Sequence, residues 1–103
     1  MLTGKQRSYL RAIGNNLDSI MQIGKNGIED GFVAQVEEAL EAREIIKITV
    51  LKNSLYGARE ACEELCSITG AEPVQVIGNR FIIYRRSNEN PTIELPEGKR
   101  KDL

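Results

Sequence analysis

Apolar residues in this 103-residue chain recur with a period near four in some stretches and a period of two in others. The order of these stretches is the feature that most constrains the fold. From Glu44 to Leu51, three apolar residues (Ile46, Ile48 and Val50) alternate with polar neighbours, which predicts a strand. Helical spacing precedes this stretch and follows it. Strands joined by helices run parallel with right-handed crossovers, so the sequence predicts an α/β fold.

The expected order of elements is α-β-α-β-α-β-β in a single domain. Helices are expected at residues 4–14, 31–43 and 58–69, and strands at 18–23, 44–51, 73–77 and 80–86. Gly78-Asn79 separates the last two strands and predicts a two-residue hairpin of the primed type. The strands should therefore form a mixed four-stranded sheet packed with helices. We assign residues 1–96 to this domain and residues 97–103 to a basic, flexible tail.

Several local signals support these boundaries. Thr3 and Gln6 have the spacing of a capping box at the start of the first helix. Asp30 is a candidate N-cap of the second helix, and Gly70 is a typical residue to end the third. We expect Tyr84 to be buried. The remaining acidic residues of the helices are expected on solvent-exposed faces: Glu37, Glu38, Glu41, Glu60, Glu63 and Glu64.

The two cysteines, Cys62 and Cys66, are expected to be buried thiols on one face of the third helix. There is no histidine and no CxxC pair, so we expect neither a metal nor a cofactor. Two cysteines are few for a secreted scaffold, which favours a cytoplasmic location. No apolar run approaches the roughly 20 residues of a membrane helix, so we expect no membrane contact.

Charge is unevenly distributed although the net charge is only −1. Residues 1–27 carry four basic residues against one acidic residue, whereas residues 28–66 carry nine acidic residues against four basic ones. The remainder, residues 67–103, is nearly balanced, with six basic and five acidic residues. This distribution permits one basic and one acidic face on the same domain, which matters more for nucleic-acid binding than the sum.

The tetrapeptide Gly24-Lys25-Asn26-Gly27 lies between the first strand and the second helix. Glycine lets another backbone approach closely, and the lysine supplies a cation, so the loop could hold a phosphate backbone. The glycines could equally serve only the geometry of a tight turn. Glu29 and Asp30 place negative charge at the start of the helix. We therefore expect phosphate to meet the turn and its lysine rather than the helix end.

The sequence resembles the CRM domain family (chloroplast RNA splicing and ribosome maturation), in its stand-alone bacterial YhbY form. The resemblance covers residues 2 to 96 and rests on the joint order and spacing of several short segments. These segments are Leu2–Gln6, Ile23–Gly27, Ala39–Lys47, Val76–Asn79, Ile82–Arg85 and Ile93–Pro96.

The resemblance implies a fold similar to the C-terminal domain of translation initiation factor 3. It also implies an RNA-binding protein without catalytic activity that associates with precursors of the large ribosomal subunit. The family's GxxG loop, which is compared with that of KH domains, maps onto Gly24 to Gly27. Members are often plainly basic, whereas this chain is slightly acidic. This difference in net charge from the family favours a defined basic face or a protein partner nearby.

We therefore expect the chain to be a monomer that contacts the backbone of ribosomal RNA. The residues expected to contact RNA are Gly24, Lys25, Asn26, Gly27, Lys5, Arg7, Arg11, Lys47 and Arg85. The scarcity of exposed aromatic residues favours recognition of backbone and shape over sequence. An adaptor that binds ribosomal proteins through the acidic helices is the alternative. No histidine, nucleophile elbow or Walker sequence is present, so we expect neither an enzyme nor a small-molecule substrate.

Overall fold

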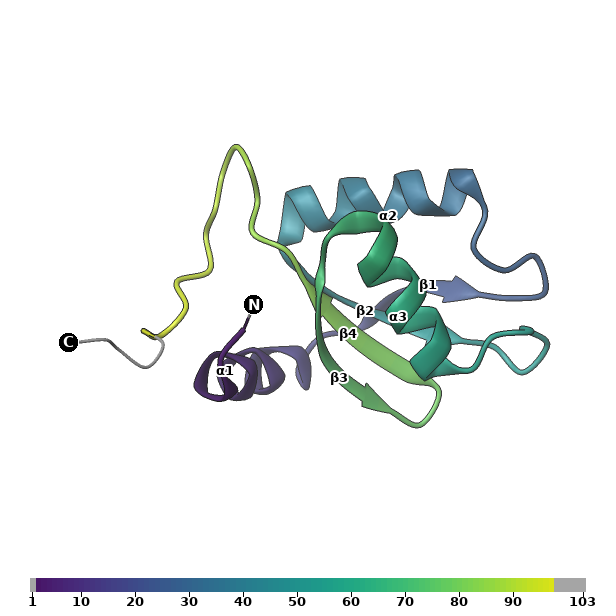
Figure 1. Ribbon diagram of the computed structural model, residues 1–103, viewed down its shortest axis with the longest axis horizontal. Helices are drawn as coiled ribbons and strands as arrows, with labels where there is room; N and C mark the ends of the chain where they lie inside the picture. Colours follow the sequence, from purple (N-terminus) through teal and green to yellow (C-terminus); the bar gives the residue numbers. More distant parts are fainter. Residues whose placement is uncertain (1, 98–103) are drawn as a thin grey trace.

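The computed structural model describes residues 2–97, and its elements follow the predicted order (Figure 1). The predicted fold class is confirmed. The helices are α1 (Gly4–Gly14), α2 (Asp30–Arg43) and α3 (Ala58–Thr69). The strands are β1 (Ser19–Ile23), β2 (Ile45–Val50), β3 (Glu72–Ile77) and β4 (Arg80–Tyr84). Every expected boundary agrees with these to within two residues. Residues 98–103, most of the expected tail, lie outside the described part of the chain.

The four strands form one sheet in the order β1-β2-β4-β3. β1 and β2 are parallel because α2 connects them, whereas β4 runs antiparallel to both of its neighbours. The β3–β4 connection is the predicted two-residue hairpin. Gly78 has a φ of +58°, and its neighbour Asn79 does not have a positive φ, as in a type II′ turn.

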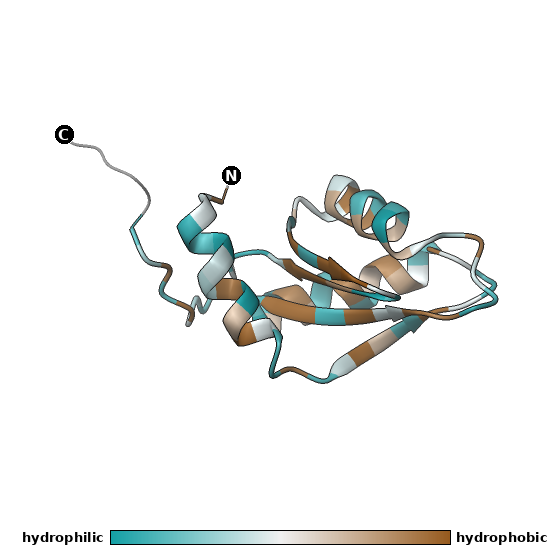
Figure 2. Ribbon diagram, turned by 90° about the horizontal axis from the view of Figure 1, so that it is seen from below, coloured by the Kyte–Doolittle hydropathy of each residue, from teal (hydrophilic) through white to brown (hydrophobic). Residues whose placement is uncertain are grey.

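Helices cover both faces of the sheet and create two cores. α2 and α3 pack on one face, and α1 packs on the other (Figure 1). The larger core lies beneath α2 and α3 and includes Ile48, Leu65 and Phe81. The smaller core lies beneath α1, where Leu10 meets Tyr84. Tyr84 is buried, as predicted, and Figure 2 shows the mostly apolar colouring of the strands between the layers.

The helix termini follow the sequence signals with one exception. The capping box is confirmed, because the Gln6 N–H donates to Thr3 Oγ1 at 3.1 Å and the Thr3 N–H donates to Gln6 Oε1 at 3.0 Å. The third helix ends at Gly70 in the left-handed conformation, also as predicted. The assignment of Asp30 as N-cap is wrong by one residue. Glu29 occupies that position, and its side chain makes no capping hydrogen bond.

The expectation that the acidic face of α2 is fully solvated is wrong for Glu41. Its carboxylate accepts hydrogen bonds from the N–H groups of Asn88 and Glu89, each at 3.0 Å, and from Ser87 Oγ at 2.7 Å. Glu37 also has a partner, because it forms an ion pair with Arg85. Sequence spacing within α2 could not reveal these partners, since they lie more than 40 residues further along the chain.

Glu44, which follows α2 directly, is a buried carboxylate with a positive φ of 68°. Its Oε1 accepts the N–H groups of Thr92 and Ile93 at 2.9 and 2.8 Å, and its Oε2 accepts the N–H of Ser87 at 2.8 Å. The same segment, residues 87–96, packs two side chains on the smaller core. We call this segment the C-terminal strap. Ile93 and Leu95 are the two side chains that make this contact.

We expect acid to release the strap selectively. Burial would raise the pKa of Glu44, but hydrogen bonds from Ser87, Ile93 and Thr92 outweigh it and lower that pKa. The N–H of Asn88 is the main cause that lowers the pKa of Glu41. Groups with lowered pKa contribute stability above their unfolded value of 4.5, and this stability is lost as the pH falls through the folded value.

NMR spectra recorded between pH 7 and pH 3 test this expectation. The amide signals of Asn88, Thr92 and Ile93 should keep their hydrogen-bonded shifts at pH 4.5 and lose them as the pH falls further, through the lowered pKa values of the two carboxylates, while those of β4 keep theirs. Strap amides that stay unchanged to pH 3 would contradict the assigned role of the two carboxylates.

Candidate nucleic-acid interface

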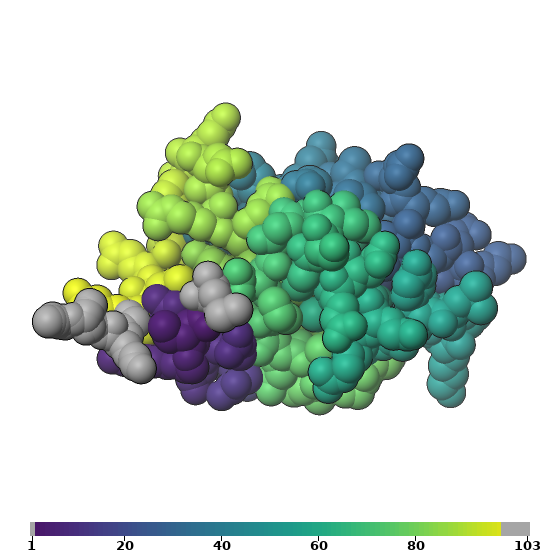
Figure 3. Space-filling model, viewed as in Figure 1, coloured from purple at the N-terminus to yellow at the C-terminus, as the bar shows by residue number. Residues whose placement is uncertain are grey.

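Three connections meet at one end of the sheet, which we call the loop end. They are residues 24–29 after β1, residues 51–57 after β2, and the hairpin at 78–79. Backbone hydrogen bonds join them, because the Leu51 N–H donates to the Ile23 carbonyl at 2.8 Å and the Val50 N–H donates to the Asn79 carbonyl at 2.7 Å. Figures 1 and 3 show the first two connections together at the right-hand end of the molecule.

The GxxG tetrapeptide forms a closed turn at the tip of this end. The Gly27 N–H donates to the Gly24 carbonyl at 3.0 Å, and Gly27 has a φ of +70°. Lys25 and Asn26 occupy the two central positions and are exposed. Neither side chain makes a hydrogen bond or ion pair with another described residue. The turn therefore presents a cation and an amide to an incoming molecule.

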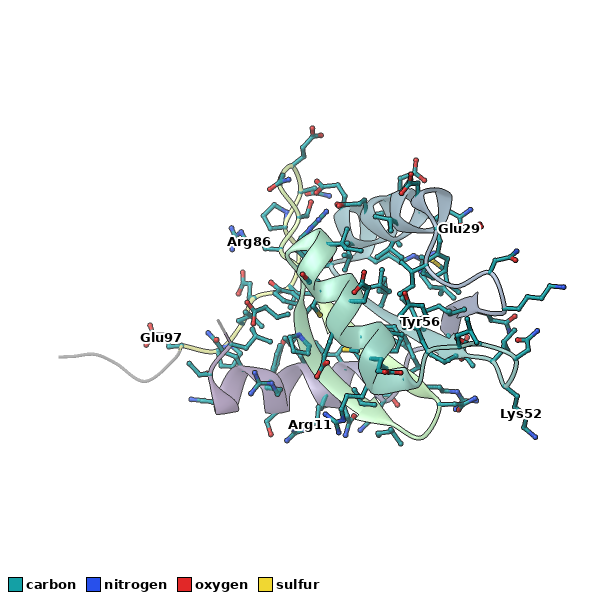
Figure 4. The ribbon with its side chains drawn as sticks, turned by 45° about the vertical axis from the view of Figure 1, so that its right-hand side comes forward. Arg11, Glu29, Lys52, Tyr56, Arg86 and Glu97 are labelled. Carbon is teal, nitrogen blue, oxygen red and sulfur yellow. The ribbon has the colours of Figure 1, made fainter. Side chains whose placement is uncertain are left out.

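Gly27 is also in close contact with the neighbouring loop. A Cβ added at this position would lie 3.3 Å from Cε2 of Tyr56, tighter than most contacts of real side chains. At Gly24 the nearest atoms would be at 3.6 Å, an ordinary contact distance. Figure 4 shows Tyr56 lying against the body of the domain rather than projecting from it. Tyr56 thus supports the turn, a role that the sequence did not assign to it.

Charges of both signs surround the turn. Lys52 projects outward from the adjacent loop, and Glu29 lies at the start of α2 (Figure 4). Glu29 and Asp30 are both exposed, so their carboxylates place negative charge at the start of α2. A polyanion would therefore find the cations at the turn and the 51–57 loop rather than at the helix terminus.

The basic residues of α1 lie on the opposite face of the sheet from α2 and α3, and the structure does not place them beside the turn (Figure 1). Lys5 is exposed. Arg7 Nε donates to the Pro73 carbonyl at 3.3 Å, and Arg11 donates to Ser8 Oγ at 3.0 Å. Both arginines are half-buried and are held in position by these contacts.

Lys47 lies on the α1 face of the sheet, between the end of α1 and the loop end. It lines a pocket of about 260 Å³ together with Asn15, which follows α1, and Arg80 at the start of β4. Arg80 is exposed and was missed by the sequence analysis. The alternation along β4 was an available signal, because Arg80 shares a face with Ile82 and Tyr84, which the smaller core contains.

Arg85 is engaged by an ion pair as well as a hydrogen bond, whereas Arg7 and Arg11 each make a single hydrogen bond. Its Nη1 pairs with Glu37 and donates to the Thr69 carbonyl at 2.9 Å. Its side chain is only 22% exposed. The structure thus gives Arg85 a role in joining β4 to α2 and α3, and it separates this residue from the loop end.

Two further properties describe the residues from 2 to 97. No helix among them is long and apolar enough to cross a bilayer. Within the same range, no three histidine, cysteine or acidic side chains gather in a way that could hold a metal ion.

Comparison with known proteins gives consistent matches along most of the chain. The CRS1 / YhbY (CRM) domain model matches residues 2–85. The probable RNA-binding protein YqeI of Bacillus subtilis is 45% identical over 96 residues, which cover 93% of this chain and all of that protein. An RNA-binding protein of Haemophilus influenzae is 32% identical over 95 residues, covering 92% of this chain and 95% of that protein.

A solved structure has the same fold. The solution structure of the hypothetical protein SAV1595 from Staphylococcus aureus superposes with a TM-score of 0.77 at 50% identity. The match covers 93% of this chain and all of that one.

Proposed function

Because the chain belongs to the CRS1 / YhbY (CRM) domain family, we propose that it is a non-catalytic RNA-binding protein that contacts the backbone of ribosomal RNA. We further propose that it acts in assembly of the large ribosomal subunit. Relatives that match along nearly their whole length are named as RNA-binding proteins, which supports the RNA partner. The ribosomal part of the proposal rests on the family resemblance.

The observation that carries the proposal is the geometry of the GxxG turn. Lys25 and Asn26 stand exposed at its tip, and Tyr56 supports it from behind. Gly24 and Gly27 have no side chains, so a sugar-phosphate backbone can approach the turn closely. Lys25 then neutralises a phosphate, and Asn26 donates a hydrogen bond to phosphate or to a base edge.

We propose that the interface continues from the turn across the α1 face of the sheet. Lys47 and Arg80 connect the loop end with Arg11, Arg7 and Lys5 on α1. Phosphate contacts spaced along such a path fix the position of an RNA without reading its sequence. Arg85 ranks last among the proposed contacts, because RNA would have to compete with the contacts that already hold its guanidinium.

Replacing Lys25 with alanine should weaken binding to ribosomal RNA about fivefold, which corresponds to the roughly 1 kcal/mol of an exposed ion pair. The thermal melt should stay nearly unchanged, because the side chain has no partner in the described part of the protein. Filter binding at several salt concentrations measures both the affinity and its salt dependence. The slope of log affinity against log salt should decrease in magnitude by about 0.7–0.9, the contribution of one phosphate.

Arg86→Ala is the matched control for this measurement. Arg86 is an exposed cation that follows β4 at the end of the sheet opposite the turn (Figure 4), so its removal changes the net charge by the same amount. Equal affinity losses in the two variants would mean that only net charge matters, and they would refute a role for the turn.

A protein adaptor remains the second candidate function, and the structure narrows the surface it could use. Glu41 and Glu44 are engaged by the C-terminal strap, which leaves Glu38 of α2 and the exposed acidic residues of α3 to meet basic ribosomal proteins. A pull-down of ribosomal proteins that survives nuclease treatment would favour this function over direct RNA contact.

A further inference from the structure

One polar atom near the proposed interface lacks a partner in the free protein. Oε1 of Gln75 is buried and accepts no hydrogen bond, and it is the one such side-chain atom among residues 2–97. A buried acceptor without a donor costs about 1–3 kcal/mol, so native proteins contain few of them. Its position next to a pocket suggests that a bound molecule supplies the missing donor.

The local structure of β3 directs this side chain toward the pocket. A register shift between Pro73 and Gln75 interrupts the β3–β4 pairing, and Gln75 pairs with Ile82 on the α1 face of the sheet. Irregularities of this kind often re-aim a side chain beside a binding site. The terminal torsion of a glutamine is broad, so a turn of its amide brings Oε1 from its covered position into the pocket.

The pocket is the one that Lys47 lines, of about 260 Å³. Its other side chains include the cation of Arg80, the amides of Asn15 and Asn79, and the aliphatic side chain of Ile77, which is 56% exposed. No carboxylate lines it. Two cations without a neighbouring acid favour the binding of an anionic group. The exposed aliphatic surface of Ile77 favours a ligand that also has a flat apolar face.

These features together match one nucleotide. We propose that this pocket receives a single unpaired nucleotide of the bound RNA, with its base on Ile77 and its phosphate between Lys47 and Arg80. A base that carries an exocyclic amino group donates to Oε1 of Gln75. Uracil has no such group, and its ring N3–H lies between two carbonyl oxygens that repel Oε1, so adenine is preferred over uracil. The volume lies below the 300–1,000 Å³ of pockets for drug-sized ligands, as expected for one base rather than a large cofactor.

The inference rests on the proposed RNA-binding function and adds a point of base selection to it. The glycines and Lys25 of the GxxG turn contact the RNA backbone in our proposal, and these contacts do not distinguish bases. Splayed-out bases of single-stranded segments are what proteins read in RNA, and the pocket offers a place for one of them.

NMR titration of the ¹⁵N-labelled chain with adenosine monophosphate and uridine monophosphate tests the pocket without any larger RNA. We expect the side-chain amide signals of Gln75 and the backbone amides of Gly78 and Asn79 to shift with adenosine monophosphate. Uridine monophosphate should bind at least about threefold more weakly, since it cannot donate from an amino group. Shifts confined to residues 24–27, or equal binding of the two nucleotides, would overturn the proposal.

Two variants separate the two parts of the site. Gln75→Leu should abolish the preference for adenine without lowering the melting temperature, because it removes an unsatisfied buried acceptor. Arg80→Gln should weaken the binding of both nucleotides at least about threefold. The control Arg59→Gln, which changes an exposed cation of α3 on the other face of the sheet, should leave their binding unchanged. A preference for adenine that persists in Gln75→Leu would also overturn the proposal.

A single-stranded RNA containing either adenine or uracil at one position then distinguishes failure of the pocket from failure of the proposed function. RNA that does not bind the unmodified chain refutes both. The pocket alone is refuted if the RNA binds and its affinity is lowered by Lys25→Ala but not by Gln75→Leu or Arg80→Gln.

Discussion

Replacing Glu44 with alanine should lower the free energy of unfolding by about 3 kcal/mol. The buried carboxylate accepts the backbone N–H groups of Ser87, Thr92 and Ile93, and each loses its partner in the variant. Hydrogen bonds to a charged group contribute about 1.5–3 kcal/mol each, and part of the loss is recovered because the freed strap becomes solvated. Urea denaturation followed by circular dichroism measures the change.

Glu38→Ala is the control for this experiment. Glu38 is an exposed carboxylate of α2, so its removal should change the stability by no more than about 0.5 kcal/mol. The loss of stability in Glu44→Gln should lie between those of Glu44→Ala and Glu38→Ala. An amide keeps one acceptor oxygen, but its NH₂ group points two donors at the N–H groups of the strap. If Glu44→Ala and Glu38→Ala unfold at the same urea concentration, the strap does not depend on this carboxylate.

Replacing Gly27 with alanine should reduce RNA affinity more than Lys25→Ala does, by about tenfold or more. An alanine at a φ of +70° is strained by about 1–2 kcal/mol, and its Cβ presses on Tyr56. The turn relieves both by changing shape, which withdraws Lys25 and Asn26 together from the RNA. Loss of one hydrogen bond to a charged group already corresponds to about tenfold in affinity.

Gly31→Ala provides the matched comparison, since it makes the same substitution four residues away. Gly31 lies in α2, and an added Cβ there meets no atom within 4 Å. Alanine should therefore stabilise the helix by about 0.5–1 kcal/mol and leave RNA binding unchanged. Gly27→Ala with native affinity in filter binding would show that the shape of the turn does not matter for RNA contact.

The sequence was sufficient for the order of elements because that information is local. Alternation of apolar residues in β2 and the Gly78-Asn79 turn each lie within a few neighbouring residues, and the structure confirms both. The capping box at Thr3 is local in the same sense.

Long-range partners account for what the sequence analysis missed. The helical position of Glu41 predicts a solvated carboxylate, but backbone N–H groups of the strap donate to it. Nearly every residue type has a backbone N–H, so the sequence does not indicate which ones will act as donors. Arg85 is among the residues predicted to contact RNA, and its ion pair with Glu37 of α2 joins residues 48 positions apart, which sequence spacing could not reveal. The support of Gly27 by Tyr56 likewise depends on how two loops meet at the end of the sheet.

The contact between the first helix and the strap bears on how such a domain can be used in larger proteins. The Gln6 side-chain amide donates to the Pro96 carbonyl at 3.0 Å, so the segments that begin and finish the fold lie side by side. A domain with adjacent ends can be inserted into a surface loop of another protein, or joined in tandem to copies of itself, without stretching its sheet. Fusion junctions placed outside this pair of residues should therefore preserve the fold.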